Sequence, residues 1–141
     1  MDNKRKNLIG AIAGIITFSI ASYGVQKVFF KPFDKIMVEA AIELNKTCPI
    51  MVDQDTRLDN TVSLPGNIFQ YNYTLINYEK EELNPDTLRK YLEPGIISTV
   101  ATNPDMKIFR DHLSTIAYNF NDKNGAFIVK LSITPDMYKK K

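Results

Sequence analysis

The sequence is poor in the residues on which much protein chemistry depends. It holds one cysteine, Cys48, and one histidine, His112, and it has no tryptophan. A single cysteine excludes an internal disulfide and a Cys-x-x-Cys redox site. A single histidine excludes any site that needs two imidazoles, such as a His-x-x-x-His zinc site. A lone cysteine is usually a small buried hydrophobic residue, and that is the role we expect for Cys48.

Motifs for phosphate binding and for serine hydrolysis are also missing. The sequence contains no Gly-x-x-x-x-Gly-Lys-Ser/Thr, Gly-x-Gly-x-x-Gly or Gly-x-Ser-x-Gly. Asp53, Asp55, Arg57 and Asp59 alternate along one expected strand, and alternating carboxylates can attract Ca²⁺. The EF-hand glycine and terminal glutamate are missing, however, and Arg57 would repel a cation. We therefore expect no metal, no cofactor and no enzyme activity, with an enzyme based on Cys48 or on Asp53 and Asp55 as the alternative.

Basic residues gather at the two ends of the chain. Residues 1–32 hold five basic residues against one acidic residue, and three lysines occupy positions 139–141. Residues 33–138 hold ten basic against fifteen acidic residues, which gives this part a charge of −5. A nucleic-acid-binding domain is expected to carry a basic folded face with aromatic residues between the bases. We therefore expect no binding to nucleic acid.

A long uncharged apolar run follows the first basic cluster. Residues 8–25 are 18 residues without a charge, and Lys27 can extend its amine to the membrane interface. A bilayer core needs about 20 apolar residues in a helix. The sequence therefore predicts a basic tail at residues 1–7 and a single transmembrane helix, a signal anchor, at residues 8–30.

The same segment permits a second interpretation. Ser19-Ile20-Ala21 is a small-x-small pattern, so residues 1–21 could instead form a cleaved signal peptide. Basic residues on the two sides of the apolar run are nearly balanced in number, but those on the N-terminal side are clustered in a short tail. We therefore expect a single-pass inner (cytoplasmic) membrane protein with a cytoplasmic N-terminus and a periplasmic or extracellular domain. Gly10 and Gly14 would allow two such helices to pair closely in a homodimer.

Residues 31–138 have the pattern of one small α+β domain, followed by a basic tail at residues 139–141. The apolar spacing predicts an amphipathic helix over 34–46. Alternating side chains predict strands at 51–58 and 68–78, joined as a hairpin by a Pro65-Gly66-Asn67 turn. A helical region that Pro94 interrupts comes next, and strands at 114–120 and 126–134 form a second hairpin. This order, helix–hairpin–helix–hairpin, predicts helices on one face of a four-stranded antiparallel sheet.

The most individual stretch of the sequence lies at the start of this domain. It reads Asn45-x-x-Cys48-Pro49-x-x-Val52-Asp53-x-x-Thr56-Arg57-Leu58, and Pro65-Gly66-Asn67 and Tyr71-x-Tyr73 follow it. With these motifs the chain resembles small uncharacterised bacterial proteins that carry one N-terminal membrane segment. The resemblance covers most of the domain and implies a shared fold, but it implies no particular activity.

These observations favour an interaction domain over an enzyme. We expect a membrane-anchored, non-enzymatic domain of the bacterial envelope that binds a protein partner. Its partner face is predicted to include Asp53, Asp55, Arg57, Tyr71 and Tyr73. The alternative is a carrier of a small apolar ligand or lipid, with a pocket between helices and sheet, secreted after signal-peptide cleavage. Aromatic residues at strand spacing more often form a core than line a binding groove, so Tyr71 and Tyr73 could also be interior.

Overall fold

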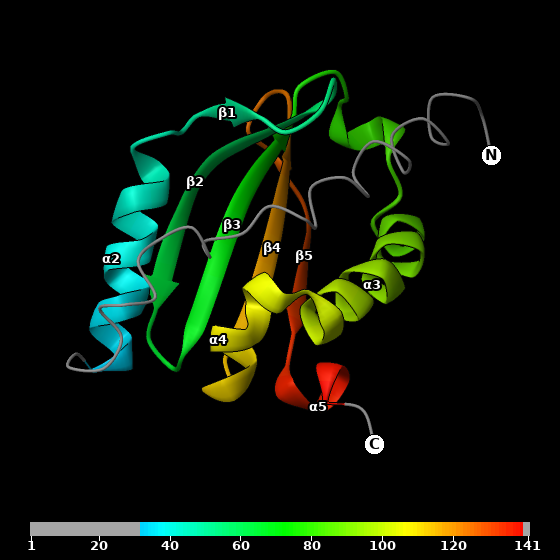
Figure 1. The fold of residues 1–141 in the computed structure, drawn as a ribbon. Helices are drawn as coiled ribbons and strands as arrows, with labels where there is room; N and C mark the ends of the chain where they lie inside the picture. Colours follow the sequence, from blue (N-terminus) through cyan, green and yellow to red (C-terminus); the bar gives the residue numbers. More distant parts are fainter. Residues whose placement is uncertain (1–31, 140–141) are drawn as a thin grey trace.

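The computed structural model describes residues 32–139, which form a five-stranded sheet with helices packed against it (Figure 1). The elements in chain order are α2 (Phe33–Asn45), β1 (Ile50–Met51), β2 (Thr56–Leu64), β3 (Ile68–Leu75), η3 (Lys80–Glu82), α3 (Pro85–Thr102), η4 (Pro104–Met106), α4 (Lys107–Asp111), β4 (Thr115–Asp122), β5 (Phe127–Ile133) and α5 (Pro135–Tyr138). None of the helices in residues 32–139 has the length and apolar character that a membrane span requires. The predicted transmembrane helix at 8–30, with Gly10 and Gly14, lies outside the described residues.

The strands lie side by side in the order in which they occur in the chain, β1-β2-β3-β4-β5. All neighbouring pairs are antiparallel except β3 and β4, which run parallel and are joined by a connection that contains α3 and α4. Parallel strands need such a crossover because a tight turn can join only antiparallel neighbours. The α+β class is confirmed, but the prediction of a four-stranded antiparallel sheet is wrong: the sheet is five-stranded and mixed.

The first hairpin is displaced along the sequence from its predicted position. The expected strand at 51–58 is divided into β1 and the start of β2, and β2 continues to Leu64. The cause is Asp53, whose Oδ1 accepts hydrogen bonds from the backbone N–H groups of Asp55 and Thr56, each at 2.8 Å. This side-chain bonding forms a turn where alternation alone predicts a strand. The turn after β2 is confirmed, with positive φ angles at Gly66 (87°) and Asn67 (63°).

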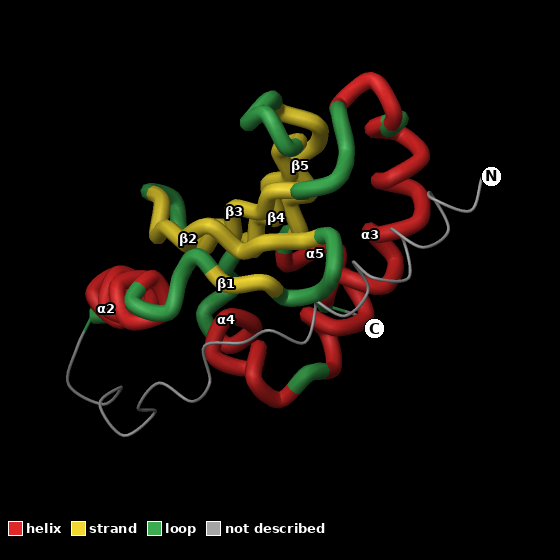
Figure 2. Tube along the Cα trace, turned by 90° about the horizontal axis from the view of Figure 1, so that it is seen from above, coloured by secondary structure: helices red, strands yellow, loops and turns green. Residues whose placement is uncertain are grey.

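The helices and the inner face of the sheet share one core (Figures 1 and 2). Helix α2 packs on β2, and α3 packs on β5. The predicted helix at 34–46 is confirmed within one residue at each end. The inner face of β3 and β4 consists of alternate buried side chains, namely Phe69, Tyr71, Tyr73, Leu75, Ile116, Tyr118 and Phe120. Among residues 32–139, no helix lies on the opposite face of the sheet.

Helix α3 runs through the proline that was expected to interrupt it. It extends from Pro85 to Thr102 with Pro94 inside it. Proline removes one backbone hydrogen bond and crowds the preceding turn. The helix is maintained by burial of one continuous apolar stripe, formed by Leu88, Leu92, Ile96 and Val100. Tertiary packing therefore outweighs the local preference of Pro94.

The β4–β5 turn is organised by a buried carboxylate. Asp122 Oδ1 accepts the backbone N–H groups of Asn124 and Ala126, and Oδ2 accepts the N–H of Lys80. Burial by itself would raise the pKa of Asp122, but these three hydrogen bonds, helped by the nearby charge of Lys123, lower it below its ordinary value. Asp122 therefore holds the turn and the start of η3 together as a carboxylate.

Candidate interaction surfaces

The structure divides the predicted partner face between three environments. Asp53 organises the turn before β2, and Asp55 accepts a hydrogen bond from Asn77 Nδ2 at 2.6 Å. Arg57 lies on the face of the sheet opposite the helices, where it pairs in register with Thr74 on β3. Tyr71 and Tyr73 lie in the interior, where their side chains are 1% and 0% exposed. The two tyrosines thus do not share a surface with Asp53, Asp55 and Arg57.

Arg57 has a carboxylate partner on its own strand. Its Nε donates to Asp59 Oδ1 at 2.5 Å. The other oxygen of Asp59, Oδ2, accepts the hydroxyl of Thr74 on β3. The paired charges offer no cation site, and within residues 32–139 no three His, Cys, Asp or Glu side chains gather as metal ligands would.

Stacked aromatic rings fill the inner face of the central strands. The ring centroids of Tyr71 and Tyr118 are 5.4 Å apart, those of Tyr73 and Phe120 5.3 Å, and those of Tyr71 and Tyr73 6.2 Å. Burial raises the pKa of all three tyrosines well above the ordinary value. These phenols are therefore neutral at physiological pH, and we interpret them as core residues.

The interior tyrosines differ in how their hydroxyl groups are satisfied. The hydroxyl oxygens of Tyr71 and Tyr73 are buried, and neither has a hydrogen-bond partner among residues 32–139. Tyr138, by contrast, donates to the backbone oxygen of Ser114 at 2.7 Å. A buried polar group without a partner lowers stability, whereas a bonded one contributes to it.

The same chemical change is therefore expected to have opposite effects at two positions. Tyr73→Phe should raise the free energy of unfolding by about 1 kcal/mol, because it removes a buried unsatisfied hydroxyl. Tyr138→Phe should lower it by about 1 kcal/mol, because it leaves the Ser114 carbonyl without its partner. Urea unfolding followed by circular dichroism measures both values. A loss of stability in Tyr73→Phe would contradict the absence of a partner for its hydroxyl.

Cys48 and His112 are far apart and do not form a nucleophile–base pair. Cys48 is half-buried beyond the C-terminal end of α2, and its Sγ donates to Leu44 O at 3.4 Å. The ring of His112 stacks on Phe33, the first residue of α2, with centroids 3.8 Å apart. A helix of this length separates its two ends by roughly 20 Å.

The environment of Cys48 also disfavours the reactive thiolate. Burial raises the pKa of the Cys48 thiol, and the negative charge of Asp59 raises it further. A hydrogen bond with Thr47 lowers this pKa by less than burial raises it. The thiolate is the nucleophilic form of cysteine, so a raised pKa reduces its population at neutral pH.

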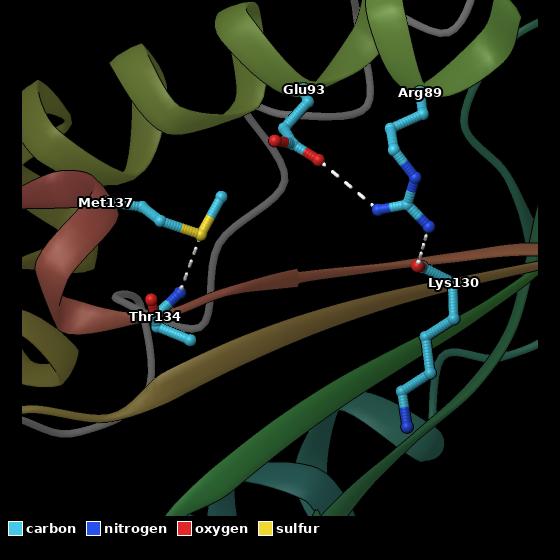
Figure 3. A network of polar contacts seen from close by, with 5 residues as sticks. All are labelled: Arg89, Glu93, Lys130, Thr134 and Met137. Atoms are coloured by element: carbon cyan, nitrogen blue, oxygen red, sulfur yellow. Dashed lines mark hydrogen bonds and ion pairs between the residues drawn. The ribbon is translucent and has the colours of Figure 1, made fainter. Parts of the chain in front are cut away.

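Side chains from two helices occupy the two long edges of the sheet. On the β2 edge, Asn45 Nδ2 donates to Thr61 O at 2.9 Å, and Thr61 N–H donates to Asn45 Oδ1 at 2.7 Å. On the β5 edge, Arg89 Nη2 donates to Lys130 O at 3.0 Å, and Glu93 Oε2 lies 3.3 Å from Arg89 Nη1 (Figure 3). Unpaired edges are where another strand would add. At these positions the edges are therefore already occupied.

Helix α2 presents apolar side chains to solvent on the side away from the sheet. Val38 is 47% exposed and Ile42 is 53% exposed. They are four residues apart, so they lie on the same helix face. A shallow hollow beside them is lined by Asp34, Lys35, Val38 and Glu39. The apolar spacing predicted an amphipathic helix here, but Val38 and Ile42 were not among the predicted partner-face residues, although their i, i+4 spacing was available as a signal.

Comparison with known families identifies a domain but no activity. Residues 32–128 match the model of the family described as a domain of unknown function, DUF8479. No curated protein sequence matches the chain significantly.

Similar folds occur among solved structures of bacterial proteins. A protein of Pseudomonas aeruginosa described as a candidate secreted protein has a TM-score of 0.60 and 16% identity, with coverage of 75% of this chain and 92% of that one. EpsS, the pilotin of the Vibrio vulnificus type 2 secretion system, has a TM-score of 0.58 and 13% identity, with coverage of 77% and 93%. The type II secretion system pilotin AspS of Vibrio cholerae has a TM-score of 0.54 and 10% identity, with coverage of 74% and 90%. At these identities the likeness is one of fold.

Proposed function

We propose a protein-binding role for this chain, which belongs to the DUF8479 family of domains of unknown function. In this proposal it is a non-enzymatic interaction domain of the bacterial envelope. Two proteins of similar fold are pilotins of type II secretion systems, and a third is described as a candidate secreted protein. These likenesses support a location in the envelope and a protein as partner. The anchor at residues 8–30 is proposed from the sequence alone, and it would keep the domain close to a partner at the membrane.

The observation that carries the proposal is the exposed apolar face of α2. Adjacent exposed aliphatic side chains on a helix, such as Val38 and Ile42, are the type of surface onto which a partner helix packs. Asn45 and Arg89 occupy the sheet edges, which disfavours binding by strand addition at those positions. The stacked rings on β3 and β4 occupy the inner face of the sheet, which disfavours the alternative of an apolar ligand held against them.

Site-specific photo-crosslinking in cells tests this face directly. A photoreactive amino acid placed at position 42 of the full-length chain should give one defined covalent adduct with a partner protein. The double variant V38D/I42D should reduce the yield of that protein in co-purification at least tenfold, because a charge buried against an apolar partner is costly. Mass spectrometry identifies the partner in both experiments.

Tyr91 provides the matched control, since it is 51% exposed on a different helix, α3. Crosslinking from position 91 and the variant Tyr91→Asp should leave the adduct and the co-purification unchanged. An adduct with twice the mass of the chain would show self-association through α2 in place of a separate partner. Equal adducts from positions 42 and 91 would overturn the assignment to α2.

A further inference from the structure

The face of the sheet opposite the helices, its outer face, carries a row of three asparagines that ends in a lysine. Asn60 on β2 pairs in register with Asn72 on β3, Asn72 with Asn119 on β4, and Asn119 with Lys130 on β5. Cross-strand partners share one face of a sheet. At about 4.8 Å between strands, the row crosses the sheet over roughly 14 Å. All four side chains are half-buried or exposed, and Figure 3 shows that of Lys130 directed away from α3.

The amides on β2 and β3 are fixed in place by bonding to one another. Gln70 Nε2 donates to Asn72 Oδ1 at 2.8 Å, and Asn72 Nδ2 donates to Asn60 Oδ1 at 2.7 Å. Each amide group has two N–H donors and an oxygen with two acceptor positions. The hydrogen-bonded series of Gln70, Asn72 and Asn60 therefore leaves both donors and acceptors open along its length. Gln70 Oε1, at one end of this series, is buried and has no hydrogen-bond partner among residues 32–139, so the open groups are those of Asn72 and Asn60.

The charge of this face indicates what kind of molecule would match these open groups. Arg57 and Asp59 neutralise each other, so Lys130 adds only a single amine to an otherwise uncharged row. A nucleic acid or another polyanion would require several basic residues. An apolar protein surface would leave the amides buried without partners, at a cost for each. The row therefore suits an uncharged ligand that both donates and accepts many hydrogen bonds.

One exposed aromatic ring borders the row. Phe127 is 55% exposed and pairs in register with Asn121, which places it on the same outer face. The C–H faces of sugar rings pack against aromatic rings, while sugar hydroxyls both donate and accept hydrogen bonds. We propose that the outer face of β2, β3, β4 and β5 binds a neutral glycan chain, with Asn60, Asn72 and Asn119 bonding its hydroxyls and Phe127 stacking on a ring.

A titration of the full-length, ¹⁵N-labelled protein with chitohexaose and, separately, cellohexaose tests this site by nuclear magnetic resonance. The detergent must have no sugar headgroup, because such a headgroup would compete for the site. With at least one oligosaccharide, the amide-group signals of Asn60, Asn72 and Asn119 should shift in a saturable manner. Asn72→Ala should weaken binding at least tenfold, because it removes the central amide and the bonds to both neighbours. Phe127→Ala should also weaken binding.

Two control variants separate this site from other surfaces. Asn124→Ala removes an exposed asparagine outside the row, and binding should be unchanged. The double variant V38D/I42D should also bind normally, so failure of the α2 proposal would leave this one intact. The proposal is overturned if neither oligosaccharide shifts the row at millimolar concentration. It is equally overturned if the row shifts with protein concentration alone, which would show that a second copy of the chain covers it.

Discussion

Phe69→Ala is expected to lower the free energy of unfolding by about 4 kcal/mol, the typical cost of truncating a fully buried phenylalanine. The Phe69 side chain is 0% exposed, and its ring centroid lies 5.3 Å from that of Tyr71 and 5.2 Å from that of Phe109. It therefore connects β3 to α4 through the centre of the core. Since small domains are stable by only about 5–15 kcal/mol, this single change removes a large share of the total.

Urea unfolding followed by circular dichroism measures this loss. Phe127→Ala is the matched control, because that phenylalanine is 55% exposed and its truncation should change stability by less than about 0.5 kcal/mol. Phe69→Leu should cost much less than Phe69→Ala, because the leucine refills part of the volume. Equal effects of Phe69→Ala and Phe127→Ala would contradict the position of Phe69 in the core.

Asn45→Ala is expected to lower the free energy of unfolding by about 2 kcal/mol, although it removes only a small polar side chain. The Asn45 amide bonds both the N–H and the C=O of Thr61, as a neighbouring strand would. Thr61 is 3% exposed, so water cannot readily replace the lost partner. The variant should also self-associate more readily, because an open strand edge can pair with another chain.

Asn45→Asp tests the donor half of this contact. The carboxylate retains an acceptor for the Thr61 N–H but places a charged oxygen against the Thr61 carbonyl in place of the N–H donor, so we expect a loss at least as large as that of Asn45→Ala. Urea unfolding gives the stability, and static light scattering at rising protein concentration gives the association. An Asn45→Ala variant as stable as the original chain would show that the β2 edge does not depend on this amide.

Glycan binding on the outer face and protein binding on α2 would use opposite sides of the same domain. The two proposed functions are compatible, since Val38 and Ile42 lie on the helical side and the row lies on the side of the sheet that no helix of residues 32–139 covers. A domain of this kind could hold a protein partner and an uncharged polymer at the same time. The two sets of variants, V38D/I42D and Asn72→Ala, separate these contributions.

The predicted partner face shows which features local sequence patterns can predict and which they cannot. Asp53 and Asp55 belong to a turn because the Asp53 carboxylate accepts hydrogen bonds from the backbone N–H groups of Asp55 and Thr56. Such side-chain bonding competes with the strand that the alternation of side chains predicted. Tyr71 and Tyr73 alternate correctly, but alternation does not state which face of a strand is the core. That choice depends on the elements that cover the sheet. The sequence therefore supplied the residues but not their division between interior and surface.

By itself, the sequence determined the elements with a strong local cause. The period of apolar residues defined α2, the aromatic alternation defined β3 and β4, and the Pro65-Gly66-Asn67 turn followed from residues that adopt positive φ angles. Only the tertiary structure decided the parallel pairing of β3 with β4, the continuity of α3 through Pro94, and the side-chain bonding of Asn45 and Arg89 at the sheet edges. Each of these features depends on contacts between residues that are distant in the chain. The free energy of these contacts outweighs local conformational preference, and such contacts leave no periodic pattern in the sequence.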